Sequence, residues 1–114
     1  MRRLFALLIV GIGTVVMFAP LSGGASAAPP EIPLLIEKNQ FQPADVKVKS
    51  GAPFVLVITN RNAAAAEFES KELRVEKVIP AGKTVKVRMR ALKPGTYPFV
   101  DDFHAQTTGR IIAE

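Results

Sequence analysis

The chain has 114 residues, no cysteine, and a formal net charge of +5 from 15 basic and 10 acidic side chains. Without cysteine it can form no disulfide, and any bound metal must be held by histidine, carboxylate, methionine or backbone oxygen. The charge is mild and the basic residues are scattered among acids, so the clustered basic face of a nucleic-acid-binding protein is not expected.

The first 27 residues have the features of a cleavable signal peptide. Arg2 and Arg3 precede an almost wholly apolar stretch over residues 4–18, and Ala25-Ser26-Ala27 supplies the small residues of a cleavage site. The stretch is shorter than the roughly 20 residues that span a bilayer, which disfavours a permanent membrane anchor. An uncleaved anchor is the alternative interpretation. We therefore expect a signal peptide over residues 1–27 and one exported domain over residues 28–114, which does not span the membrane once cleaved.

The remaining sequence alternates short strand-like segments with turns. Residues 28–33 contain three prolines and predict an extended leader. Residues 46–49 alternate apolar and basic side chains, whereas residues 54–59 are apolar on both faces, which predicts a central strand buried between two layers. Further strands are expected over residues 75–79, 85–90, 96–103 and 110–113, with turns at residues 80–83 and 93–95.

The segment 85–90 has the clearest alternation. It is expected to bury Val85, Val87 and Met89 and to expose Lys86, Arg88 and Arg90. Met89 is thus a core residue by this pattern rather than a metal ligand, and the basic row is a solvated face. About seven short strands without a helical period predict an all-β sandwich with antiparallel or mixed sheets.

Five side chains that can bind metal fall in two short segments. Glu67 and Glu69 share a face if their segment is extended, and Asp102 and His104 share one if residues 101–104 continue a strand; Asp101 lies beside them. An imidazole with carboxylates suits iron, manganese, zinc or cupric copper and does not suit cuprous copper. The alternative is that the single histidine is structural or simply exposed.

Several motifs resemble cupredoxin-like domains and together cover nearly the whole segment after residue 27. They are Phe41-Gln42-Pro43, the runs 46–51 and 54–60, and the later runs 80–85 and 92–99. The resemblance implies a Greek-key β-sandwich. A narrower match, in residues 66–73 and in Asp102-Phe103-His104, is similar to small periplasmic cupredoxin-like proteins that accompany bacterial high-affinity iron permeases.

The chain departs from blue-copper members of that family at three of four ligand positions. Where they carry histidine, cysteine, histidine and methionine, this chain has Ala66, Asp101, His104 and Thr107. A blue-copper centre requires the thiolate and cannot form here. The resemblance implies instead a site with His104 as the retained ligand and Glu67, Glu69, Asp101 and Asp102 as candidates for the others.

The resulting hypothesis is a periplasmic metal-binding accessory protein of iron uptake. It would bind iron or copper and act with an inner-membrane iron permease and other periplasmic uptake components, as a monomer or as a homodimer that completes the coordination sphere. The alternative is a metal-free scaffold or interaction module that docks an acidic partner on the basic row. An enzyme is not expected, apart from an auxiliary role in ferrous iron oxidation if copper binds.

Overall fold

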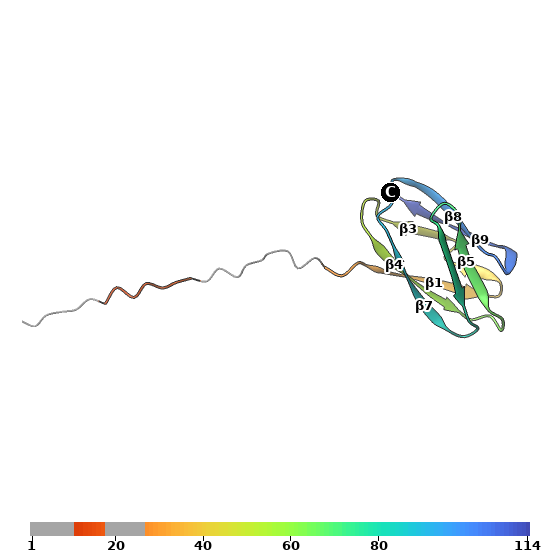
Figure 1. Cartoon of the computed structure of the whole chain (residues 1–114), viewed down its shortest axis with the longest axis horizontal. Helices are drawn as coiled ribbons and strands as arrows, with labels where there is room; N and C mark the ends of the chain where they lie inside the picture. The colour runs from red at the N-terminus through yellow and green to blue at the C-terminus, as the bar shows by residue number, and fades with distance from the viewer. Residues whose placement is uncertain (1–10, 18–26) are drawn as a thin grey trace, which may run out of the picture.

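The computed structural model describes residues 11–17 and 27–114; most of the predicted signal peptide lies outside these ranges. The described residues form nine strands and no helix, and the strands make two sheets packed face to face (Figure 1). The all-β sandwich predicted from the alternation is therefore confirmed. Within the described part of the chain, no helix is long and apolar enough to cross a membrane.

The two sheets are mixed. One has the order β2-β1-β4-β7 and the other the order β3-β9-β8-β5-β6. The pairs β1–β4 and β3–β9 are parallel and the remaining pairs are antiparallel. The strand bounds are β1 Glu31–Glu37, β2 Gln40–Gln42, β3 Asp45–Val48, β4 Phe54–Asn60, β5 Ala66–Ser70, β6 Val75–Ile79, β7 Thr84–Met89, β8 Gly95–Asp101 and β9 His104–Ala113.

The first strand corrects one sequence prediction. The extended leader predicted for residues 28–33 is wrong from Glu31 onward, because β1 begins there and pairs with β4. Strand β2 contacts only the end of β1, from Leu35 to Glu37, so β1 is an edge at Pro33, where proline is tolerated. Strands β1, β2 and β5 lie outside the six strand ranges predicted above and bring the number in the described residues to nine.

The core lies between the sheets and follows the period-two pattern. Phe54, Leu56 and Ile58 of β4 are buried, and the outward residues between them are half-buried, so β4 is central but fully covered on only one face. Met89 is 4% exposed, which confirms it as a core residue. Three aromatic rings, those of Phe41, Phe68 and Phe99, pack together with centroids 4.8 to 6.3 Å apart.

The basic row of β7 is exposed as predicted, but two of its members are engaged. Lys86 Nζ lies 2.6 Å from Glu31 Oε1, and Arg90 donates a 2.9 Å hydrogen bond to the carbonyl of Leu73.

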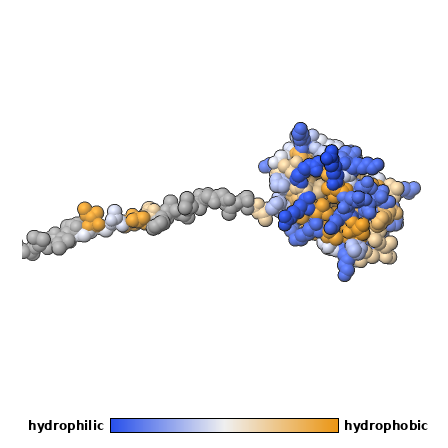
Figure 2. All heavy atoms as spheres, in the orientation of Figure 1, coloured by the Kyte–Doolittle hydropathy of each residue, from blue (hydrophilic) through white to orange (hydrophobic). Residues whose placement is uncertain are grey.

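Polar side chains cover much of the visible face of the domain, with apolar residues showing between them (Figure 2).

Candidate metal site

Three carboxylates gather on the outer face of the five-stranded sheet. Strand β5 buries Ala66, Phe68 and Ser70 and turns Glu67 and Glu69 outward, where both are half-buried. Asp102 follows β8, the neighbour of β5, and its N–H donates a 2.8 Å hydrogen bond to the carbonyl of Glu67. One oxygen from each of Glu67, Glu69 and Asp102 can be placed within 4.8 Å of the others. We call these three residues the carboxylate cluster.

A fourth acid, Glu76, adjoins the carboxylate cluster. Strand β6 pairs with β5 so that Glu76 stands directly opposite Glu69, on the same face of the sheet. Glu76 is not among the metal ligands predicted from the sequence. The alternation along β6 predicts that Glu76 points away from the face that carries Val75 and Ile79. Its position beside Glu69 depends on how β6 is aligned with β5.

Two acids of this face, Glu67 and Glu69, have raised pKa values. A hydrogen bond with Glu76, burial, and the charges of Glu76, Asp102 and Glu69 raise the pKa of Glu67 from 4.5 to about 6. Burial, then a hydrogen bond and the charge of Asp102, also raise the pKa of Glu69, against the opposing charge of Lys71. Like charges held this close favour either a shared proton or a bound cation.

Asp101 and His104 form a separate pair on the inner side of the same sheet. The Asp101 side chain is 0% exposed and its Oδ2 lies 2.8 Å from His104 Nδ1, while the histidine side chain is 34% exposed. The other oxygen, Oδ1, accepts hydrogen bonds from the N–H of Glu67 at 2.9 Å and of Phe103 at 3.1 Å. Both oxygens of this buried carboxylate are therefore engaged.

A register shift brings this pair together. Strands β8 and β9 pair regularly up to Val100 and Thr108, and regular continuation would place Asp101 opposite Thr107. The register shifts at that point, so that Asp101 faces His104 across the turn formed by Asp102 and Phe103. The strand predicted through residue 103 ends two residues earlier, and the last strand begins at His104 rather than at Arg110.

The five predicted ligands thus divide into two groups. Glu67, Glu69 and Asp102 meet on the outer face, whereas Asp101 and His104 meet on the inner side. Because residues 102 and 103 form a turn, Asp102 and His104 do not continue one strand face. Among the described residues, no group of three potential ligands within 4.8 Å includes His104.

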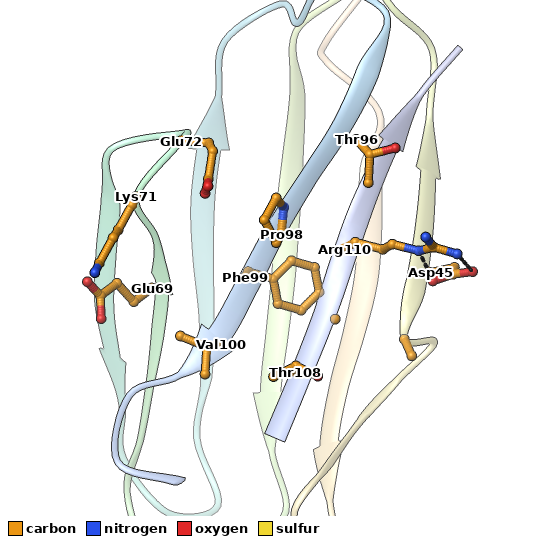
Figure 3. Close-up of a pocket in the computed structure, with 12 residues that line it drawn as sticks. Asp45, Glu69, Lys71, Glu72, Thr96, Pro98, Phe99, Val100, Thr108 and Arg110 are labelled. Carbon is orange, nitrogen blue, oxygen red and sulfur yellow. Dashed lines mark hydrogen bonds and ion pairs between the residues drawn. The ribbon is translucent and has the colours of Figure 1, made fainter. Parts of the chain in front are cut away.

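A groove of about 630 Å³ runs over the outer face beside the carboxylate cluster (Figure 3). Pro98 and Val100 of β8 lie in its middle, Glu69 and Lys71 stand on one side, and the ion pair of Asp45 with Arg110 closes the other at 2.8 Å. The hydrogen bond from Arg110 lowers the pKa of Asp45. Glu69 belongs to both the groove and the carboxylate cluster, so a molecule in the groove would contact the cluster.

The residues at the usual cupredoxin ligand positions do not fit a blue-copper ion. Ala66 has no donor atom, and Thr107 is 3% exposed and donates its hydroxyl proton to the carbonyl of Asn39 at 2.7 Å. Asp101 already accepts hydrogen bonds at both oxygens. No buried side-chain nitrogen or oxygen of the described residues lacks a hydrogen-bond partner. The interior there is a satisfied polar network, without the thiolate that blue copper requires.

Two mixed sheets of this order define a domain of the cupredoxin type, in which three of the four usual copper-ligand positions, on β5, β8 and β9, carry other residues. The chain belongs to the cupredoxin-like domain family, whose pattern it matches over residues 7–113.

The chain is also similar in sequence to a protein of Rickettsia prowazekii. The sequence is 32% identical over 77 residues to the uncharacterized protein RP394 of Rickettsia prowazekii (strain Madrid E), a match covering 68% of this chain and 62% of that protein. The chain therefore spans less than two thirds of the length of that relative.

Solved structures share the fold at low identity. The metal binding domain of the Cu(I)-exporting P-type ATPase CopA of Streptococcus pneumoniae D39, with Cu(I), has a TM-score of 0.66 and 15% identity over 77% of this chain and 89% of that one. Auracyanin A, a blue copper protein of Chloroflexus aurantiacus, has a TM-score of 0.64 and 13% identity over 76% of this chain and 100% of that one. These likenesses show the fold alone.

Proposed function

We propose that this protein is an exported metal-binding accessory of iron uptake, which holds an iron ion on the carboxylate cluster and delivers it to an inner-membrane permease. The observation that supports this role most directly is the convergence of Glu67, Glu69 and Asp102 within 4.8 Å, from segments more than thirty residues apart in the chain. The resemblance of the chain to periplasmic proteins that accompany iron permeases supports a role in iron uptake.

The donor set favours a hard cation. Three carboxylates offer only oxygen, which suits ferrous or ferric iron and manganese and does not suit cuprous copper. A hydrogen bond with Glu76 and burial raise the pKa of Glu67, burial raises that of Glu69, and neighbouring acidic charges add to both shifts. The repulsive part of this cost is relieved when a cation neutralises the charge. Copper remains the cargo to test at His104, whose nitrogen lies apart from the cluster.

Calorimetric titration tests the proposal. Ferrous iron under anaerobic conditions, cupric copper and zinc are titrated into the wild type, Glu67→Gln, Glu69→Gln, Asp102→Asn and His104→Ala. Loss of iron binding in the three cluster variants, with retention in His104→Ala, is the expected result. Glu37→Gln, which removes an acid from the other sheet, is the matched control. Iron affinity that is equal in wild type and all cluster variants would overturn the assignment of the site.

The metal-free interaction module is the second candidate. It relies on the exposed row Lys86, Arg88 and Arg90, but Lys86 pairs with Glu31 and Arg90 bonds to the carbonyl of Leu73. Capture of partner proteins from inner-membrane extracts, with iron-loaded and chelator-treated protein, separates the two functions. A delivery protein binds the permease in a metal-dependent manner, whereas a scaffold captures its partner equally in both states.

A further inference from the structure

Three donors surround the buried carboxylate of Asp101. Its Oδ1 accepts the N–H groups of Glu67 and Phe103, and its Oδ2 faces Nδ1 of His104 at 2.8 Å. An ionised carboxylate can only accept hydrogen bonds, so a ring nitrogen that bonds to it must carry the proton. The proton of a neutral His104 ring therefore sits on Nδ1.

We propose that Asp101 is a positioning residue rather than a metal ligand: it fixes His104 in the Nδ1–H tautomer, so that Nε2 is the nitrogen offered to an incoming cation. Only the role of Nε2 as a metal ligand rests on the proposed metal-binding function. The tautomer of His104 is a property of the protein alone. A histidine that ligates metal commonly donates its other N–H to a carboxylate, which orients the ring and strengthens the ligand.

The surroundings of His104 support this assignment. The ring is partly exposed and lines a hollow of about 590 Å³ together with Asn39, Gln40, Ala105, Gln106 and Thr107. These neighbours are amides, a methyl group and a hydroxyl, so His104 is the only ionisable side chain among the described residues that line the hollow. With Nδ1 turned toward the interior, a cation in this hollow would take one nitrogen from the protein and complete its coordination from water, amide oxygen or a partner's ligands.

The chain has a single histidine, so its two ring nitrogens can be read without assignment. Long-range proton–nitrogen correlation on 15N-histidine-labelled protein, without metal and at a pH where the ring is neutral, reports which nitrogen carries the proton. The expected spectrum has the proton on Nδ1 and a lone pair on Nε2. A proton on Nε2, or the tautomer mixture of free histidine, would overturn the proposal. This measurement needs no variant, so it stands even if substitutions at Asp101 prevent folding.

Asp101→Asn sharpens the test. Its amide oxygen still accepts the two backbone N–H groups, but its NH₂ group now donates toward Nδ1 and drives the ring proton to Nε2. Asp102→Asn, one residue away on the other face, is the control and is expected to leave the tautomer unchanged. A wild-type tautomer that persists in Asp101→Asn contradicts the positioning role.

Titration with cupric copper and with zinc then tests the ligand role. Asp101→Asn is expected to lower affinity at His104 by about 10- to 100-fold, the usual effect of removing such a partner. His104→Ala is expected to abolish that binding. If the wild type has the expected tautomer but no cation binds at His104, metal binding at this position fails while the tautomer assignment holds. If cations bind but Asp101→Asn changes neither the tautomer nor the affinity, the positioning role alone is wrong.

Discussion

Phe99 and Gly109 lie opposite each other on β8 and β9, and the ring of Phe99 occupies the space where a side chain at position 109 would stand. A Cβ added at Gly109 would lie 2.5 Å from two ring atoms of Phe99 and 2.9 Å from the carbonyl oxygen of Ala44. That oxygen accepts a hydrogen bond from the N–H of Arg110 at 2.8 Å, so it cannot move freely.

Gly109→Ala is therefore expected to destabilise the domain by about 1–3 kcal/mol, the usual cost of overpacking. Guanidinium denaturation measures the loss. In a Phe99→Ala background the ring is gone and most of the additional cost should disappear, leaving the part due to Ala44. An equal loss in both backgrounds would show that the ring is not the obstacle.

Asp101 and Asp102 are expected to differ sharply in their contribution to stability. Asp101→Ala removes a buried acceptor and leaves three partly buried N–H groups without their partner, which is expected to cost about 3 kcal/mol. Asp102→Ala on the exposed turn should change stability by less than about 0.5 kcal/mol. Chemical denaturation of the two variants under identical conditions is the test. Similar losses in both would contradict the buried network described for Asp101.

The pH dependence of stability follows from the carboxylate cluster. The pKa of Glu67 is about 6 in the folded protein and near 4.5 in an unfolded chain, so the folded state holds this proton more tightly. Folding stability contributed by this group is thus full below about pH 4.5 and is lost as the pH rises through about 6. The melting temperature of metal-free protein should fall between pH 5 and pH 7.5.

Glu76→Gln isolates this effect from other titrations. Its amide can donate to the Glu67 carboxylate and it carries no charge, so the pKa of Glu67 should fall and the drop in melting temperature should shrink. Glu37→Gln, on the other sheet, is expected to keep the wild-type drop. If both variants behave alike, the coupling of Glu67 to Glu76 is refuted.

Metal affinity should depend on pH for the same reason. Protons and cations compete for the carboxylate oxygens, so iron binding should weaken as the pH falls through about 6, the pKa of Glu67. Titration calorimetry at pH 5 and pH 7.5 measures this in the wild type and in His104→Ala. The same pH dependence in both proteins is expected, whereas its disappearance in His104→Ala would assign it to the histidine instead.

Most of the fold could be predicted from alternation along the chain, because burial of one face imposes a period of two. That pattern placed β4 and β7 correctly and identified Met89 as core. It failed at β1, where three prolines suggested an extended leader. Prolines exclude a helix but permit an edge strand, and only pairing with β4 reveals the strand.

The site was only partly predictable. The spacing of Glu67 and Glu69 in an extended segment placed them on one face, and this holds. The separation of Asp101 from Asp102, and of Asp102 from His104, depends on where β8 ends and on the register shift after Val100. The position of Glu76 beside the carboxylate cluster depends on the alignment of β6 with β5. These are relations between segments, which local residue patterns do not encode.

The alternation of Asp101 and Asp102 gives two chemically identical neighbours opposite tasks, one sealed inside the sandwich and one turned to the solvent. Asp101 is the last, inward-facing residue of β8 and Asp102 is the first residue of the turn that follows, so their roles are set by position and not by residue type. Deletion of Val100, the residue between Phe99 and Asp101, would shift both acids by one position, placing Asp102 in the interior and the anchor of His104 on the outer face. The length of this strand is therefore as strict a requirement of the site as the identity of any side chain in it.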